Sequence, residues 1–479
     1  MMRALFLQAP SFEGFDGGAG SRYQARREIR SFWYPTWLAQ PCAMTEGSRL
    51  IDAPPHGIDL LQVTNAVRDF ELVVIHTSTP SFSSDLKTIE TLKAIKPDIK
   101  VGLIGAKVAV DPEGSLAACE HIDFVARNEF DFAIKEIAEG RSLTAVAGIS
   151  YRNREGIIVH NEERPILEDM DLLPFVTPVY RRDLDIRKYF IGYLLHPYIS
   201  IYTGRGCKSR CTFCLWPQTV GGHRYRTRSV GHVVEEIAWA KQAFPMVREF
   251  FFDDDTFTDN APRAEAVAKG LGKLGVTWSC NAKPNVARDT LKVLRDNGLR
   301  LLLVGYESGN QQILHNIKKG ILIERARKFT RDCRELGIAI HGTFIMGLPG
   351  ETKETIEETI RYACEINPNT IQVSLAAPYP GTFLHRQALA NGWLDTADPD
   401  LVGEDGVQIA PLHYPHLSGT EIFDSVEELY RRFYFRAGKI ASIVGEMVTS
   451  PQMMKRRLRE GAEFFHFLRE RRRVSRCAS

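Results

Sequence analysis

The first part of the chain, from residue 1 to about 150, alternates short apolar runs with segments whose apolar residues recur every three or four positions. Short apolar runs are typical of buried parallel strands, and the three-to-four spacing is typical of helices that pack on them. The pattern therefore predicts a doubly wound α/β domain, with helices such as Leu86–Ile95 between the strands. The expected strands are Arg3–Gln8, Arg49–Asp52, Leu72–His76, Val101–Ile104 and Phe124–Ala126.

A second alternation of strands and helices runs from residue 198 to about 385. One helical pattern begins after Ser229 as its N-cap, and another follows Thr352. Repeated strand–helix units indicate a (β/α)6 partial barrel, in which chemistry is expected at the carboxyl ends of the strands. The expected strands are Tyr198–Tyr202, Glu249–Phe252, Thr277–Cys280, Arg300–Gly305, Ile338–Ile345 and Thr370–Leu375.

Two further regions complete the predicted organisation. Residues 151–197 are rich in charge and proline and are expected to form a connector, with a β-hairpin turn near Asn153–Gly156. Residues 386–479 are expected to be helical. The boundaries of the two main domains are therefore predicted at 1–150 and 198–385.

Composition narrows the class of protein. The 479 residues are enough for two or three domains, and contents of 44% hydrophobic and 25% charged residues are typical of soluble proteins. The net charge of +2 offers no general case for nucleic acid binding. The first residues turn polar too soon for a signal peptide, and no apolar run approaches the length of a membrane span. We therefore expect a cytoplasmic protein.

Three cysteines lie close together at Cys207, Cys211 and Cys214, with the spacing C-x3-C-x2-C. Three thiolates can hold a [4Fe–4S] cluster and leave one of its irons open for chemistry. Zinc is the alternative, with His223 as the nearest fourth ligand. The other cysteines are scattered and are expected to be small buried residues or inert thiols; they are Cys42, Cys119, Cys280, Cys333, Cys364 and Cys477.

The cysteine spacing, with the aromatic Phe213 before the last cysteine, resembles the signature of the radical S-adenosylmethionine (SAM) superfamily. The resemblance implies that SAM chelates the open iron and that one electron cleaves it to a 5′-deoxyadenosyl radical. The cofactor carries this chemistry, and the protein orients and protects it. A reductase, flavodoxin or ferredoxin is implied as the electron donor.

The same resemblance implies SAM-binding residues at three further strand ends, and Phe213 beside the cluster. Asp254 or Asp255 is expected to hold the amino group of SAM. Glu307 and Ser308 are expected at the ribose and amino acid parts, although Glu307 is also a candidate for an ion pair with a barrel Lys or Arg. Gly347 lies in a loop that is expected to cradle the adenine with backbone groups.

The first domain resembles the Rossmann-like cobalamin-binding domain that precedes the barrel in many members of the superfamily, and Tyr34–Ala39 matches a motif near its start. Thr77, Ser78 and Gly105 lie at strand ends where cobalamin would bind. Two glycine motifs are replaced, by Gly105-Ala106 and by Arg127–Asp131, so a vestigial or substrate-binding domain is the alternative. No histidine ligand to cobalt is predicted.

Three segments resemble radical SAM proteins of hopanoid biosynthesis: residues 12–28, 214–219 and 221–225. The resemblance implies a hopanoid lipid as substrate. The amino-sugar ether of bacteriohopanetetrol would undergo ring contraction to a cyclitol ether. The alternative is a cobalamin-dependent methylase of a lipid or another small molecule.

The segment from Lys455 to Arg473 carries eight basic and three acidic residues. Its apolar residues recur at helical spacing, which suits a helix lying on an anionic bilayer at the inner surface of the cell membrane. A helix packed on the barrel with a solvated basic face is the favoured interpretation, because the apolar face also suits a core. The apolar positions are Met454, Leu458, Ala462, Phe465 and Leu468.

Overall fold

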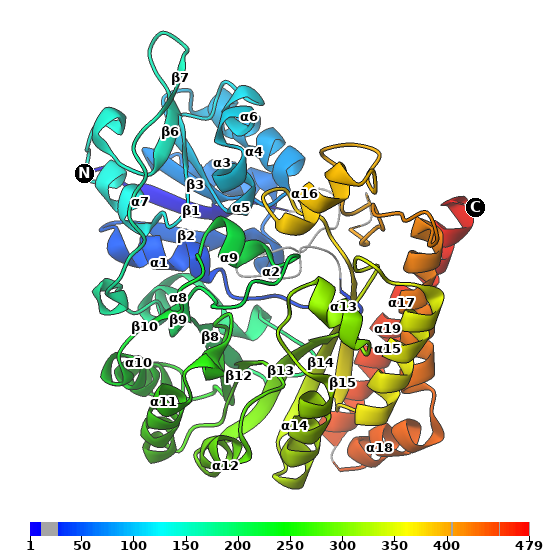
Figure 1. The fold of residues 1–479 in the computed structure, drawn as a ribbon. Coiled ribbons are helices and arrows are strands. Elements are labelled where there is room, and N and C mark those ends of the chain that lie inside the picture. The colour runs from blue at the N-terminus through cyan, green and yellow to red at the C-terminus, as the bar shows by residue number, and fades with distance from the viewer. Residues whose placement is uncertain (11–26, 404–405, 450, 479) are drawn as a thin grey trace.

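The computed structural model describes residues 1–10, 27–403, 406–449 and 451–478, and Figure 1 shows two sheet-based domains followed by a group of helices. The fold is the predicted α/β class, with a parallel half-barrel as its second domain. Most of segment 12–28, which was compared with hopanoid proteins, lies outside the described residues.

The first domain is built on a sheet of strand order β2-β1-β3-β4-β5-β6-β7 within the described residues. The first five strands are parallel and match the predicted runs closely, because each is a short and mostly apolar segment between helices. The strands are β1 (Ala4–Gln8), β2 (Arg49–Asp52), β3 (Leu72–His76), β4 (Lys100–Ile104) and β5 (Phe124–Ala126). The helices are α1 (Thr36–Met44), α2 (Ala53–His56), α3 (Leu60–Val67), α4 (Phe82–Ile95), α5 (Ala106–Val110), α6 (Pro112–Ala117) and α7 (Asp131–Ala138).

The predicted hairpin forms β6 (Ile149–Arg152) and β7 (Ile158–His160), and β6 pairs antiparallel with β5. It therefore extends the sheet of the first domain and is not a separate part of the connector. The sheet ends at His160, about ten residues beyond the predicted boundary.

The second domain is a parallel sheet of order β15-β14-β13-β12-β11-β8 in the described chain. Its first and last strands, β8 and β15, form the two edges, so the barrel has an open seam. The strands are β8 (Tyr198–Ile201), β11 (Glu249–Phe252), β12 (Trp278–Ala282), β13 (Leu299–Glu307), β14 (Ala339–Met346) and β15 (Thr370–Leu375). The helices that cover them are α10 (Val230–Ala243), α11 (Ala261–Leu274), α12 (Arg288–Asp296), α13 (Gln311–Asn316), α14 (Ile323–Glu335) and α15 (Lys353–Ile366).

The predicted N-cap Ser229 is confirmed, and Thr352 caps a second barrel helix. The Ser229 side chain accepts a hydrogen bond from His232 N at the start of α10. Thr352 forms a capping box with Thr355 at the start of α15. These caps fix where two barrel helices begin and therefore the lengths of the loops before them.

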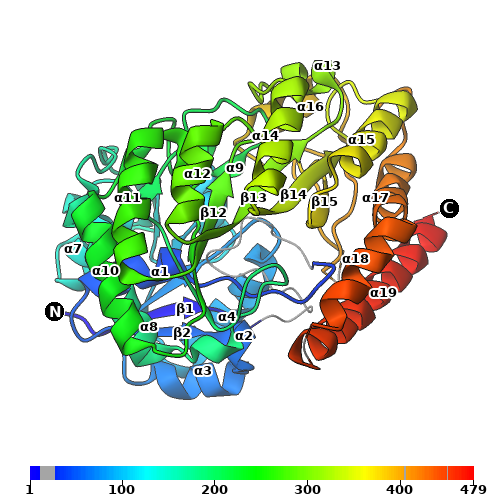
Figure 2. The same ribbon diagram turned by 90° about the horizontal axis from the view of Figure 1, so that it is seen from below.

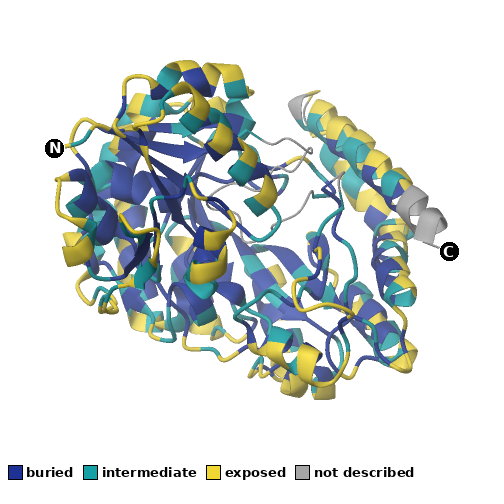
Figure 3. Ribbon diagram, turned by 90° about the horizontal axis from the view of Figure 1, so that it is seen from above, coloured by how far each residue is buried: buried dark blue, intermediate teal, exposed yellow. Residues whose placement is uncertain are grey.

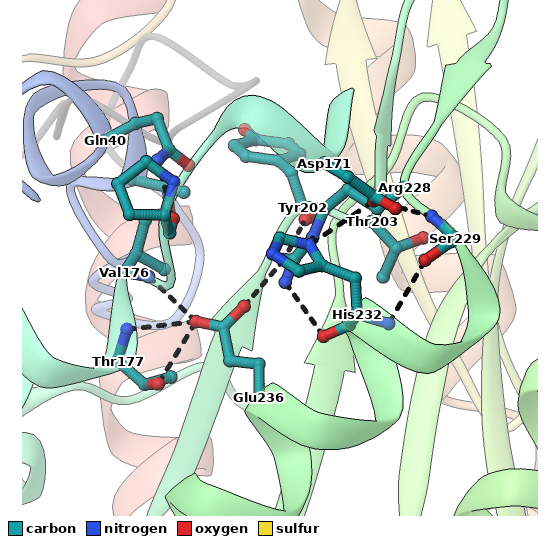
Figure 4. A network of polar contacts seen from close by, with 12 residues as sticks. Gln40, Asp171, Val176, Thr177, Tyr202, Thr203, Arg228, Ser229, His232 and Glu236 are labelled. Atoms are coloured by element: carbon teal, nitrogen blue, oxygen red, sulfur yellow. Dashed lines mark hydrogen bonds and ion pairs between the residues drawn. The ribbon is translucent and has the colours of Figure 1, made fainter. Parts of the chain in front are cut away.

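A buried carboxylate joins the connector to the barrel, as Figure 4 shows. Glu236 of α10 accepts hydrogen bonds from Val176 N, Thr177 N and Thr177 Oγ1, at 2.8–3.1 Å. It also pairs with Arg228 at 2.6 Å. A buried charge is tolerated only when it is paired and hydrogen-bonded, and this network meets that condition. The connector helix α8 (Thr177–Asp183) is thereby held on the barrel.

The C-terminal region is helical only in part. The helices are α16 (Phe383–Ala390), α17 (Gly419–Tyr434), α18 (Ala437–Met447) and α19 (Pro451–Ala478). The prediction is wrong between α16 and α17, where Gly392, Pro399, Pro411 and Pro415 interrupt the chain. Helices α18 and α19 lie side by side at the outer edge of the molecule (Figure 2). None of the described helices is both long enough and apolar enough to cross a membrane.

Candidate active site

The cysteine loop begins directly after the first barrel strand and is closed at its base by a small ribbon. Strands β9 (Gly204–Arg205) and β10 (Arg226–Thr227) pair antiparallel there. Gly206 follows with φ 85°, and a Cβ at this position would overlap the carbonyl oxygens of Arg224 and Gly221. Only glycine fits this conformation and this close approach. The ribbon therefore fixes where Cys207 leaves the sheet.

The middle of the loop is anchored to distant parts of the chain. Thr212 N donates to Ile317 O at 3.0 Å, and Thr212 O accepts from Leu384 N at 2.9 Å. Gln218 adds three hydrogen bonds to carbonyl groups of the loop, including Cys214 O at 2.8 Å. The cysteine loop is thus held by the segment after α13 and by α16, which follows the last barrel strand.

The thiols have the surroundings of cluster ligands. Cys207 and Cys211 are buried and Cys214 is half-buried, and all three are free of disulfides. Burial raises the pKa of the Cys211 thiol, and the charge of Lys319 opposes that rise. A coordinating metal would deprotonate such thiols outright.

The alternative of a zinc site does not fit. In the described part of the chain, no group of three His, Cys, Asp or Glu side chains is arranged to hold a single metal ion. His223, the suggested fourth zinc ligand, has its Nδ1 against the carbonyl oxygens of Cys207 and Ser209, at 3.3 and 3.0 Å.

The two aspartates of the acidic turn after β11, Asp254 and Asp255, have different surroundings. Both oxygens of the buried Asp254 are engaged by Thr203 N and Oγ1, at 2.5 and 2.6 Å, and by Tyr225 OH at 2.7 Å. Asp254 is therefore a strut between β8 and the cysteine loop, and this geometry does not support the predicted contact with SAM. Asp255 is half-buried and lines a small hollow with Trp37, Arg205 and Trp216. Of the two predicted carboxylates, Asp255 remains the candidate.

Glu307 ends β13 in the left-handed region, with φ 64° after a register shift in the strand. Its Oε1 accepts a hydrogen bond from Lys319 Nζ at 2.5 Å, and both side chains are about one-tenth exposed, at 8% and 11%. Burial lowers the pKa of Lys319, but Glu307, Cys211 and Cys214 together raise it well above its usual value. The predicted ion pair therefore exists, and it lies beside the cysteine loop.

Lys319 was missed by sequence reasoning. It lies in a short turn after α13, and no spacing rule links it to Glu307 or to the cysteines. The one available signal is Gly305, where a Cβ would overlap both Glu307 Oε1 and the Lys319 ammonium. A glycine two residues before a buried carboxylate is a weak indication of such a pair.

The polar groups of Ser308 and Gly347 form hydrogen bonds within the chain. The buried Ser308 hydroxyl contacts Thr359 Oγ1 at 3.1 Å and accepts from Asn310 N at 3.1 Å, which does not support a direct contact with SAM. Gly347 N donates to the buried Glu351 at 2.6 Å. Gly347 O accepts from Tyr414 OH at 2.8 Å. Phe213 packs against the core beside the loop.

The carboxyl edge of the first sheet faces the cysteine loop. Helix α9 (Leu215–Thr219) follows Cys214 directly, and its Trp216 stacks on Trp37, with ring centroids 5.3 Å apart. Trp216 also lies 6.4 Å from the ring of His76 at the end of β3. The two predicted cofactor regions, far apart in sequence, therefore meet at this tryptophan.

The residues predicted to bind cobalamin lie at strand ends where the backbone segments are packed closely together. Gly105 has φ 122°, and a Cβ there would overlap Thr77 O. His76 Nε2 is buried and has no hydrogen-bond partner among the described residues. Burial lowers the pKa of His76 to about 4, so the ring is neutral. Ser78 Oγ contacts Ser81 Oγ at 2.9 Å, which shapes the turn after β3.

Two buried ion pairs clamp the first domain onto the ribbon beside the cysteines. Arg205 pairs with Asp131 at 2.5 and 3.1 Å, and Arg226 pairs with Glu129 at 2.8 and 2.7 Å. Both pairs are bidentate, which gives them strength and fixed geometry. Asp131 and Glu129 belong to the segment Arg127–Asp131 that replaces a glycine motif, so the departure has a structural use.

Comparison with known proteins decides the class of the barrel. The Radical SAM superfamily profile matches residues 201–363, which contain the cysteine loop and the barrel strands β11 to β14. The chain carries a radical SAM domain. It is a radical SAM enzyme, with a [4Fe–4S] cluster and SAM as the cofactors of that domain.

Relatives extend beyond the radical SAM domain. An uncharacterized methyltransferase of Pyrococcus horikoshii is 28% identical over 410 residues, which are 84% of this chain and 87% of that protein. The hopanoid C-3 methylase of Methylococcus capsulatus is 26% identical over 41% of this chain and 37% of its own length. The solved structure of the cobalamin-dependent radical SAM enzyme OxsB, with aqua-cobalamin and SAM bound, has a TM-score of 0.69 at 14% identity. It covers 99% of this chain and 72% of that one, and this likeness shows the shared fold.

Proposed function

We propose that the chain is a cobalamin-dependent radical SAM enzyme in which Cys207, Cys211 and Cys214 hold the cluster. The main observation behind the proposal is that the carboxyl edge of the first sheet and the cysteine loop of the barrel come together at Trp216. This tryptophan leaves the cysteine loop and packs against Trp37 and His76 of the first domain. A cofactor on the first sheet would therefore face the radical SAM domain directly.

The surrounding residues have distinct roles in this proposal. Asp255 accepts a hydrogen bond from the amino group of SAM, and Glu307, fixed by Lys319, faces its ribose. Thr77, Ser78 and Gly105 approach cobalamin with backbone and hydroxyl groups. When bound, the cluster supplies the electron that cleaves SAM, and cobalamin supplies a transferable methyl group or a redox partner. A flavodoxin, a ferredoxin or a reductase delivers that electron.

Methyl transfer to a lipid or another small molecule is the reaction that the relatives favour, because both curated relatives described above are methyltransferases. It predicts S-adenosylhomocysteine and a methylated product from anaerobic incubation with the substrate. Formation of 5′-deoxyadenosine without any methylated product would contradict it.

Ring contraction is the second candidate. Residues 214–219 and 221–225 resemble the hopanoid-biosynthesis radical SAM protein HpnJ, which implies conversion of the amino-sugar ether of bacteriohopanetetrol to the cyclitol ether. Hydrogen abstraction from a sugar carbon creates a radical that can rearrange. Lipid analysis of a deletion strain separates the two reactions. Accumulation of the amino-sugar hopanoid with loss of the cyclitol favours ring contraction, and loss of a methylated lipid favours methyl transfer.

The cofactor assignment has its own test. Anaerobically reconstituted protein is expected to contain iron and labile sulfide and to convert SAM to 5′-deoxyadenosine. Cys211→Ala should abolish both, whereas Cys364→Ala, a half-buried cysteine on α15, should leave both intact. Gly105→Val should lower cobalamin retention while iron content stays unchanged. Zinc without labile sulfide, or an unchanged Cys211→Ala variant, would contradict the assignment.

A further inference from the structure

Helix α18 has an inverted arrangement of polar and apolar residues. Its one buried residue is Lys439, which is 8% exposed. The Lys439 ammonium donates to Pro368 O and Asn369 O, at 2.6 and 2.7 Å. Ile440 and Val444, by contrast, are 45% and 51% exposed. A soluble helix normally presents its charges to water and its aliphatic residues to the core, so α18 needs an apolar neighbour on its outer side.

The exposed apolar residues gather around one opening. Phe435, Ile440, Val444 and Phe465 all line the same cavity, and we call these four residues the apolar rim. The rings of Phe435 and Phe465 have centroids 6.0 Å apart. Val448, Met454 and Leu458 add further exposed apolar side chains on the α18–α19 hairpin. Figure 3, seen from above, shows how much of this hairpin is exposed.

Behind the rim lies a cavity of about 410 Å³, between the hairpin and the open seam of the barrel. Ile371, Tyr434 and Phe464 contribute to its walls, and His341 and Thr370 mark the amino ends of β14 and β15. The cysteine loop lies at the carboxyl ends of the strands, so this cavity is a separate site. A largely apolar cavity of this size can hold a substantial part of a lipid.

One polar group inside the cavity is available to a ligand. His341 is buried, and its Nδ1 contacts Thr370 Oγ1 at 2.7 Å. Its Nε2 has no hydrogen-bond partner among the described residues. A buried polar atom without a partner is costly, so a bound molecule with a hydroxyl or carboxyl group would be stabilised here.

The charges on the hairpin indicate what covers the rim. Between Ala437 and Phe465, the exposed ionisable side chains are both cationic, Lys455 and Arg459. The acidic residues of this stretch are buried or half-buried, and Glu446 and Glu460 pair with Arg457. Apolar side chains flanked by cations suit the interface of an anionic bilayer.

We propose that the α18–α19 hairpin docks on an anionic membrane and that the cavity behind it takes the hydrocarbon part of a membrane lipid. This inference goes beyond the proposed reaction, because the cavity is at the opposite end of the strands from the cysteines. The membrane contact predicted for the basic segment is thus assigned mainly to α18 and the rim.

Docking is tested by sedimentation of the full-length protein, purified without oxygen, with vesicles of phosphatidylglycerol or of phosphatidylcholine. The protein should sediment with phosphatidylglycerol, and Ile440→Asp with Val444→Asp should weaken this by about tenfold or more. Leu61→Asp, at a 69% exposed position on α3, is the matched control and should bind like the wild type. Equal binding of the rim variant would overturn docking. A rim-dependent dimer in light scattering would do so too, since a second copy would then cover the rim.

The cavity is tested with a fluorescent fatty acid, cis-parinaric acid. A Cβ at Gly461 meets open space in the cavity wall, so Gly461→Phe should fill the cavity and lower probe affinity by about tenfold. Gly231→Phe on α10 is the matched control, because its Cβ also meets open space. Both variants should still bind vesicles. Unchanged probe affinity in Gly461→Phe would overturn the lipid site, whatever the outcome of the SAM cleavage assay.

Discussion

At the scale of single residues, several polar side chains and backbone groups of the candidate site already have hydrogen-bond partners within the chain. Asp254, Ser308 and Gly347 were expected to contact SAM, yet their polar groups are used to hold loops in place. In the structure these three residues support the loops near the cysteines, and the direct contact of each with SAM stays a prediction. A motif records which residues lie near a cofactor, and only the fold separates those that touch it from those that support it.

The Glu307–Lys319 pair leads to a prediction on stability. Lys319→Met leaves the Glu307 carboxylate buried without its partner, so unfolding free energy should fall by about 3–5 kcal/mol. Adding Glu307→Gln should recover part of this loss. Lys328→Met removes an exposed lysine from Asp332, which keeps its ion pair with Arg288, so this change should cost less than about 1 kcal/mol. Anaerobic urea unfolding measures all three, and similar losses for the two lysine variants would contradict the assignment.

Glu351 leads to a prediction on pH dependence. Burial raises the pKa of Glu351 to about 8, and hydrogen bonds from Gly347 N and Leu348 N oppose that rise only in part. The folded state then binds this proton more tightly than the unfolded state, so stability falls as pH rises from about 5 to 8. In the Glu351→Gln variant, the fall in unfolding free energy between about pH 5 and 8 should be smaller by a few kcal/mol. Parallel unfolding curves of wild type and variant across that range would refute the prediction.

At the scale of elements, strand positions could be predicted because each buried strand is a short apolar run with a clear boundary. The region between α16 and α17 could not, since its apolar residues pack without any helical period. The ribbon of β9 and β10 was also missed, because two-residue strands leave no pattern in the sequence.

Gly206 is the position where this ribbon can be tested. Gly206→Ala introduces a Cβ that overlaps two carbonyl oxygens, so the loop must shift and iron content should fall several-fold. Gly156→Ala has a similar φ of 81° but meets open space, so it should cost only about 1–2 kcal/mol and keep full iron content. Iron and sulfide analysis after reconstitution compares the two variants and so separates the effect of the steric clash at Gly206 from that of backbone strain alone. Full loading of Gly206→Ala would show that the ribbon does not position Cys207.

At the scale of the whole molecule, both sheets were predictable, but the way they face each other was not. The clamp between Glu129 and Arg226 joins residues about one hundred positions apart, and nothing in the sequence links the two. Charged residues carry no periodic signal, so long-range pairs of this kind emerge only from the folded chain.

The clamp should couple the two domains in stability. Arg226→Met strands the buried Glu129 and should cost about 3–5 kcal/mol. Arg224→Met, two residues away on the same segment, removes an exposed pair with Glu168 and should cost less than about 1 kcal/mol. Limited proteolysis should also cut the connector faster in Arg226→Met. Equal stability and equal cleavage of the two variants would argue against a clamp.

The anchoring of Thr212 has a consequence for how the enzyme matures. Its two backbone partners, Ile317 and Leu384, are translated long after the three cysteines. The thiols therefore cannot adopt their final positions while the chain is still being translated through the barrel. We therefore expect iron and sulfide to enter the site only after synthesis has passed Leu384.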